Sequence, residues 1–143
     1  MPVPCFPKKG LNYYPTFNCF TLKKMKIRTF LQAKIHRATL TGADLDYEGS
    51  IAICPDLLEA SGIMPFEQVD VYNIDNGERL TTYAIPGEQG GLMLNGAAAH
   101  KGRAGQKVII ASYAGLDRDQ VLSHKPTLVF VDHENRIREV RNG

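Results

Sequence analysis

Long hydrophobic runs are absent from this chain of 143 residues. No apolar stretch approaches the ~20 residues that span a bilayer, so we expect no membrane partner. Net charge is also small, because 17 Lys and Arg stand against 15 Asp and Glu. Binding to a phosphate backbone needs clustered Lys and Arg, and no basic stripe follows the body of the chain. We therefore expect no nucleic-acid partner.

Cysteine and histidine are too scarce and too scattered to suggest a metal site. The three cysteines form no CxxC pair, and the four histidines show no HxH or HExxH spacing. We therefore expect no metal. An odd, unpaired set of cysteines also favours a reducing, cytoplasmic setting.

Residues 1–24 differ from the rest of the chain. They hold four of the eight prolines and four lysines without any acid, and their aromatic residues show no period. They lack the long apolar core and small-residue cleavage site of a signal peptide. We predict an irregular N-terminal extension, either a flexible arm or an upstream start that the mature protein lacks. Residues 25–143 would then form one domain with a modest core.

From Met25 onward the pattern is one of short strands. Asn76-Gly77 is a strong signal for a tight hairpin turn. Pro55 and Gly62 suit the first turn and the C-terminal cap of a brief helix, and one or two helical turns are expected in 117–123. We predict a mainly β fold, a compact barrel with a few short helices. The candidate strands are 27–41, 50–53, 69–74, 80–85, 91–95, 107–113 and 127–132.

The stretch "DLDYEGS" ends in a peptide bond that can react with its own side chain, the bond between Gly49 and Ser50. A serine hydroxyl can attack the preceding carbonyl and turn the peptide bond into an ester. Loss of the serine α-proton then expels the carboxylate, and hydrolysis leaves a pyruvoyl group on the new N-terminus. A strained turn and a donor for the developing oxyanion would help. A Gly-Ser pair alone, however, is usually just a turn.

Three ordered blocks give this pair its context: "FLQAKIHRATLTGADLDYEGS", "NGERLTTYAI" and "LNGAAAHKGRAGQKVIIASY". Together they resemble the aspartate 1-decarboxylase family, strongly over residues 25–113 and loosely beyond. The resemblance implies a double-psi β-barrel that assembles as a homotetramer. It also implies a lyase that decarboxylates L-aspartate to β-alanine and CO2 for pantothenate biosynthesis. Ile51 departs from the cysteine of many members, at a position that the acyl shift does not need.

The resemblance further implies a zymogen that cleaves itself between Gly49 and Ser50. The β chain would comprise residues 25–49, or 1–49, and the α chain residues 50–143. Ser50 would become the covalent pyruvoyl group that forms a Schiff base with the substrate, without pyridoxal phosphate or a metal. Whether an accessory maturation protein is a further partner is left open.

Site roles come from the same resemblance. Tyr83 matches the proton donor, and Thr82 matches the residue that polarises the Gly49 carbonyl during cleavage. Arg79 and Lys34 match cations for the dianionic substrate, and a bidentate fork suits a carboxylate. The remaining matches are the substrate-lining segment Asn95, Gly96, Ala97 and Ala98, and the supporting residues His36 and Tyr47.

Each of these residues also has an ordinary structural interpretation. Lys34 and Arg79 would be solvated surface charges, Tyr83 a half-buried strand aromatic, and Thr82 a cross-strand residue. Asn95-Gly96 would be a turn, and the alanines after it the start of a helix. The alternative function is a non-catalytic small β-barrel that binds a carboxylate metabolite or a protein partner. A non-catalytic relative would be expected to lose part of the set Gly49, Ser50, Thr82, Tyr83 and Arg79, which this chain keeps whole.

Overall fold

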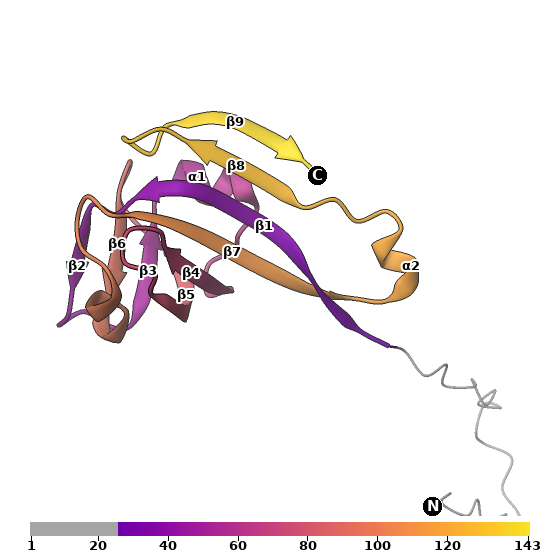
Figure 1. Ribbon diagram of the computed structural model, residues 1–143, viewed down its shortest axis with the longest axis horizontal. Helices are drawn as coiled ribbons and strands as arrows, with labels where there is room; N and C mark the ends of the chain where they lie inside the picture. The colour runs from indigo at the N-terminus through magenta and orange to yellow at the C-terminus, as the bar shows by residue number, and fades with distance from the viewer. Residues whose placement is uncertain (1–25) are drawn as a thin grey trace, which may run out of the picture.

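A computed structural model describes residues 26–143 (Figure 1). The extension expected at residues 1–24 lies outside the described residues, so the division of the chain at Met25 stays a prediction. The elements in chain order are β1 (Arg28–Thr39), β2 (Gly42–Asp44), β3 (Ser50–Ile53), α1 (Pro55–Ser61), β4 (Gln68–Asn73), β5 (Arg79–Pro86), β6 (Leu92–Asn95), the 3-10 helix η1 (Gly96–Lys101), β7 (Lys107–Leu116), α2 (Arg118–Val121), β8 (Thr127–Val131) and β9 (Ile137–Asn142).

The mainly β architecture with a few short helices is confirmed. The strands form one sheet in the order β2-β6-β3-β5-β4-β7-β1-β8-β9, whose hydrogen-bonded order is open at β2 and β9. Parallel pairs β1–β8, β2–β6 and β3–β5 are mixed with antiparallel ones, as a coiled, double-psi β-barrel-like sheet requires. Figure 1 shows β1 and β7 running together past the shorter strands β3 to β6. No helix in residues 26–143 is long and apolar enough to cross a membrane.

Local signals placed two elements correctly. Helix α1 has Pro55 in its first turn, and Gly62 adopts the left-handed cap conformation with φ of 73°. Strands β4 and β5 pair in antiparallel fashion across the turn that holds Asn76 and Gly77, where Gly77 has φ of 75°. The backbone preferences of proline and glycine therefore agree with the observed ends of the helix and with the turn of the hairpin.

Strands β2 and β9 were not expected from the sequence. Strand β2 has only three residues, and every residue of β9 is exposed. Alternation between apolar and polar residues arises only where one face of a strand is buried, so β9 carries no such signal. Strand β7 also runs three residues past Tyr113, to Leu116.

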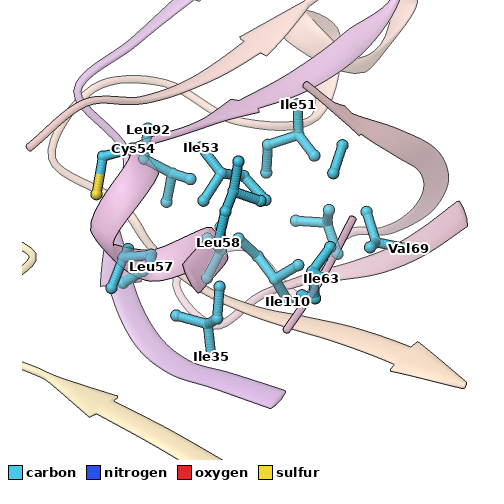
Figure 2. Packing of buried hydrophobic residues seen from close by; sticks show 14 of the residues in the cluster. Ile35, Ile51, Ile53, Cys54, Leu57, Leu58, Ile63, Val69, Leu92 and Ile110 are labelled. Carbon is cyan, nitrogen blue, oxygen red and sulfur yellow. The ribbon is translucent and has the colours of Figure 1, made fainter. Parts of the chain in front are cut away.

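The core lies on the inner face of the coiled sheet and under α1 (Figure 2). Cys54 is 1% exposed and packs among these apolar side chains as a free thiol. Alternation along β1 buries Ala33 and Ile35 and turns Lys34 to the outer face. The fully buried larger side chains are Ile35, Leu40, Ile51, Ile53, Leu57, Leu92, Leu94, Ile110, Val69, Val71, Val108 and Val129.

A buried amide adds to the β1–β8 ladder in joining the C-terminal hairpin to the barrel. Asn135 accepts a hydrogen bond from Thr39 N at 2.7 Å and donates to Thr39 O at 2.9 Å and Gly90 O at 3.1 Å. It is 5% exposed and has a left-handed backbone with φ of 61°. Asparagine is one of the few residues that tolerate this conformation, so both its backbone and its side chain are used.

We predict that Asn135→Ala lowers the free energy of unfolding by roughly 2–4 kcal/mol, because buried partners at Thr39 lose their bonds. The left-handed backbone is also unfavourable for alanine. Urea unfolding measures the change, and Asn142→Ala on exposed β9 is the control, expected within about 0.5 kcal/mol of wild type. Equal stability of the two variants would contradict the anchoring role.

Candidate active site

The turn between β2 and β3 carries the Gly49-Ser50 bond. The chain leaves β2 at Asp44, whose Oδ1 accepts from Asp46 N at 3.0 Å, and enters β3 at Ser50. Tyr47 in the turn is 55% exposed, whereas Ser50 is only 1% exposed. The bond of interest therefore lies where an exposed loop enters the barrel.

Both ends of this turn are paired with the same residue of β6. Asp44 pairs with Asn95 in the parallel β2–β6 ladder, and Ser50 pairs with Asn95 in the antiparallel β3–β6 ladder. The Asn95 side chain, itself 4% exposed, donates from Nδ2 to Ser50 Oγ at 3.1 Å. Ser50 Oγ donates in turn to Glu48 O at 3.4 Å. The Ser50 hydroxyl is thus oriented by a buried amide.

Gly96 packs directly on the turn. It has φ of 61°, and a Cβ there would lie 2.8 Å from Gly49 Cα, 2.9 Å from Gly49 N and 3.0 Å from Tyr47 O. Those contacts are too close for any side chain, so only glycine fits. Gly49 differs, since it has no left-handed φ and a Cβ there would meet nothing within 4 Å. The left-handed residue of the site is therefore Gly96, and neither packing nor a left-handed backbone requires glycine at position 49.

Strand β5 brings Thr82 and Tyr83 to the other side of Ser50. The parallel β3–β5 ladder begins at the pair Ile51–Ala84, and the residues just before this pair are Ser50 on β3 and Tyr83 on β5. Thr82 comes one residue earlier on β5, as Gly49 comes one residue before β3. The β4–β5 register is unbroken from Arg79 to Tyr83, so Thr82 and Tyr83 point to opposite faces. Tyr83 is 36% exposed on the outer face.

Arg79 lies on the same outer face of β5, four residues before Tyr83. Its guanidinium lies 4.6 Å from the ring centroid of Tyr72, its cross-strand partner on β4. None of the salt bridges within residues 26–143 involves Arg79, so its charge is available to a ligand. Tyr72 was not among the site residues predicted from the sequence, although alternation in "VDVYNI" places it on the face opposite the buried Val69 and Val71.

The other predicted cation reaches this face from further away. Lys34 of β1 pairs with Ala111 of β7, and Ala111 also pairs with Asp70 of β4. On its other side, Asp70 pairs with Thr81 of β5. These side chains form one row on the outer face, and Lys34 therefore shares a face with Arg79. Two strands, β7 and β4, separate them in the sheet order.

His36 has a different environment. Its ring packs edge-on against Phe130 of β8, with ring centroids 5.4 Å apart, and its buried Nδ1 has no hydrogen-bond partner. Burial, followed by the nearby charges of Lys34 and Arg37, holds the pKa of His36 below its ordinary value. The contacts of His36 are thus with β8, and the structure does not bring it to the Ser50 turn within one chain.

The segment after Asn95 is divided between the site and the core. Asn95 and Gly96 contact the turn, Ala98 is 9% exposed and joins the core cluster, and Ala97 is exposed. All of Gly96–Lys101 forms the 3-10 helix η1, so the alanines do begin a helix, as their ordinary interpretation predicts. The residues that contact the Ser50 turn, Asn95 and Gly96, are therefore also the cap and the first residue of this helix.

The arrangement suits acyl chemistry at a backbone carbonyl. A buried hydroxyl is oriented by an amide, a glycine braces the bond in front of it, and an arginine with a free charge lies on the neighbouring strand's outer face. No group of three or more His, Cys, Asp or Glu within residues 26–143 could hold a metal ion.

Comparison with known proteins agrees with this chemistry. Residues 25–138 match the family model described as aspartate decarboxylase. A protein of Bdellovibrio bacteriovorus named aspartate 1-decarboxylase is 54% identical over 113 residues, which cover 79% of this chain and 91% of the relative. Relatives of the same name occur in Thioalkalivibrio sulfidiphilus, 52% identical, and in a Hydrogenobaculum species, 53% identical. Each of these matches covers 80% of this chain and 91% of the relative.

The lowered pKa of His36 predicts a loss of stability in mild acid. As the pH falls below the ordinary histidine value of 6.5, the unfolded chain takes up this proton before the folded chain does. The contribution of His36 is therefore present above that pH and is lost as the pH falls through the folded pKa. His36→Gln should show a smaller fall in melting temperature between about pH 7.5 and about pH 5. The exposed His133→Gln variant is the control, and an unchanged profile for His36→Gln would refute the assignment.

Proposed function

The chain belongs to the aspartate decarboxylase family, and on that premise we propose that it converts L-aspartate to β-alanine and CO2 with a pyruvoyl group made from Ser50. The observation that carries the proposal is the Ser50 hydroxyl held by Asn95 beside a Gly49 backbone braced by Gly96. We propose further that β-alanine enters pantothenate biosynthesis and that the enzyme works in the cytoplasm. The alternative, a non-catalytic binding barrel, would not require Gly49, Ser50, Thr82, Tyr83 and Arg79 to be kept together, as they are in this chain.

Self-cleavage would begin with Ser50 Oγ attacking the carbonyl carbon of Gly49. The peptide nitrogen leaves, an ester forms, and the negative charge that develops on the Gly49 oxygen is stabilised by the Thr82 hydroxyl. Removal of the Ser50 α-proton then expels the Gly49 carboxylate. Water replaces the remaining nitrogen, ammonia departs, and residues 50–143 begin with a ketone. The absence of a side chain at Gly49 leaves its carbonyl unhindered.

Turnover uses the outer face of β5. The pyruvoyl group supplies an electron sink for the electron pair that is freed when CO2 leaves. Arg79 offers a bidentate fork to the carboxylate that the product keeps, and Lys34 adds positive charge toward the same dianion. The Tyr83 hydroxyl delivers a proton to the product carbon. No pyridoxal phosphate or metal is needed for these steps.

Assembly into a homotetramer is part of the proposal. The site's cations lie on different strands of one chain, with Lys34 on β1 and Arg79 on β5, and the contacts of His36 are with β8. A second copy could bring the missing groups to each Ser50 turn. The exposed aromatic side chains of Phe66, Tyr83 and Tyr113 also suit burial against a neighbour.

The roles of Thr82 and Tyr83 can be separated because the two side chains point to opposite faces. We predict that Tyr83→Phe cleaves normally but releases β-alanine ~10²–10⁴-fold more slowly per pyruvoyl group, as is typical of a lost general acid. Thr82→Val should instead accumulate as a folded, uncleaved chain. Mass spectrometry gives the cleaved fraction, and β-alanine release is measured against it.

Two results would overturn these assignments. Tyr83→Phe with wild-type turnover per pyruvoyl group would mean that another residue or water supplies the proton. Normal cleavage of Thr82→Val would mean that the oxyanion is stabilised elsewhere. A wild-type chain that cleaves but never releases β-alanine from L-aspartate would refute the proposed function itself.

Gly96 offers a test of the brace on the cleaved bond. Gly96→Ala must displace Gly49, so we expect cleavage at Ser50 to slow by at least ~10-fold, the effect of small misplacements on a reacting centre. Gly105→Ala is the matched control, since Gly105 also has a positive φ of 87° but open space around it. Gly105→Ala should suffer a similar backbone strain and still cleave at Ser50. Equal cleavage rates for the two variants would exclude the brace.

A further inference from the structure

A chain of polar contacts joins three strands on the outer face beneath Arg79. Tyr72 Oη lies 2.7 Å from Tyr113 Oη and donates to Asp70 Oδ2 at 3.3 Å. Thr81 Oγ1 donates to Asp70 Oδ1 at 2.5 Å. We call these four residues the Tyr72 network. Its side chains link β4, β5 and β7, in addition to the backbone ladders between these strands.

The sheet register explains why these residues meet. Tyr72 pairs with Arg79, and Asp70 pairs with Thr81, in the antiparallel β4–β5 ladder. On the other side of β4, Asp70 pairs with Ala111 of β7. Tyr113 lies two residues beyond Ala111, so it shares that face of the sheet and can reach across to Tyr72. Ala111 between them is only 2% exposed, and its side chain is too small to keep the two phenols apart.

The network restrains the Tyr72 ring. Its hydroxyl is held from two directions, by Tyr113 and by Asp70, so the ring has little freedom to swing away. The hydrogen bond with Tyr113, and then burial, raises the pKa of Tyr72 above its ordinary value. The phenol presents its π face to the guanidinium of Arg79 at 4.6 Å.

Arg79 benefits from such a platform. Its side chain is exposed, it forms no salt bridge within residues 26–143, and a free arginine has about 2 kcal/mol of rotamer entropy to lose on ordering. The guanidinium carbon of Arg79 lies over the Tyr72 ring, so the ring covers one side of the guanidinium and leaves its other side to a ligand. An arginine held in this way can offer its N–H groups to the carboxylate of a substrate.

We infer that Tyr72, held by Tyr113 and Asp70, is a positioning residue that orients Arg79 toward the carboxylate of a small dicarboxylic substrate. The inference rests on the proposed function, because it assigns Arg79 to the substrate. Tyr72 touches Arg79 and acts through it, and Tyr113 acts one step further away. The pair sets the affinity for the dianion and has no part in making the pyruvoyl group.

Four variants test the inference in protein that is expressed from the whole sequence and has cleaved itself. Tyr72→Leu removes the platform, Tyr72→Phe and Tyr113→Phe each remove one hydroxyl of the pair, and the double Phe variant removes both. The control is Arg141→Gln, which breaks the second cation–π contact found within residues 26–143, that of Arg141 on β9 with Phe130 on β8, at the opposite end of the strand order from β5. The measurements are the cleaved fraction, kcat and KM for L-aspartate, and the inhibition constant of succinate. Succinate carries both carboxylates but no amine, so it reports on carboxylate binding alone.

For Tyr72→Leu we expect KM and the succinate constant to rise together by roughly 3- to 10-fold, the range of a lost cation–π contact. The cleaved fraction should not change, and kcat should change by less than about 2-fold, since uniform binding is lost. Tyr113→Phe, which leaves the bond from Tyr72 to Asp70, should show the smallest rise, and Tyr72→Phe, which loses both bonds of that hydroxyl, a larger one that is still below the rise of Tyr72→Leu. The double variant should match Tyr72→Phe, because that single change already breaks the bond between the two tyrosines.

Each contrary outcome has a distinct meaning. A wild-type protein that does not decarboxylate L-aspartate refutes the proposed function, and the inference falls with it. Wild-type turnover with unchanged KM and succinate constants in Tyr72→Leu overturns the inference alone. A fall in kcat or cleaved fraction without any rise in these constants does so too. Should Tyr72→Leu not fold, Tyr113→Phe keeps the ring and decides the question by the same constants.

Discussion

The close contact of β6 with the turn from Asp44 to Ser50 is the constraint on which the site depends. Asn95 pairs with both ends of that turn and orients the Ser50 hydroxyl, while Gly96 lies against the Gly49 backbone with no room for a side chain. A loop held at both ends and braced in the middle has few conformations available. The nucleophile and the carbonyl in front of it are therefore positioned by the barrel itself, before any substrate is present.

Alternation along the strands then divides the work between two faces. Thr82 turns to the side of buried Val69, and its neighbours Thr81 and Tyr83 turn outward. On β5, the side chain assigned to making the pyruvoyl group, Thr82, is thereby kept apart from the side chain assigned to using it, Tyr83. On the outer face a neutral, hydrogen-bonded Tyr72 supports the charge of Arg79, so the packing of three strands reaches the substrate through one guanidinium.

Features with local causes could be predicted from the sequence, and features with distant causes could not. Proline and glycine preferences gave the bounds of α1 and the β4–β5 hairpin, and the ordered motifs indicated Ser50 and its neighbours. Strand β9 has no buried face, so its pairing left no apolar pattern to find. The bond between Tyr72 and Tyr113 joins residues 41 positions apart and depends on the β4–β7 register, which no local pattern encodes. The roles of the site residues and the division of the chain at Met25 stay predictions.

The intact mass of the purified wild-type chain, beside Ser50→Ala, tests the central claim that the barrel activates the Gly49-Ser50 bond. After warm incubation the wild type should yield two pieces. The second should have the mass of residues 50–143 less one ammonia, because the ketone replaces the serine amine, and Ser50→Ala should stay whole. A folded wild-type chain that remains uncleaved, or a second piece that begins with an unaltered serine, would contradict the account.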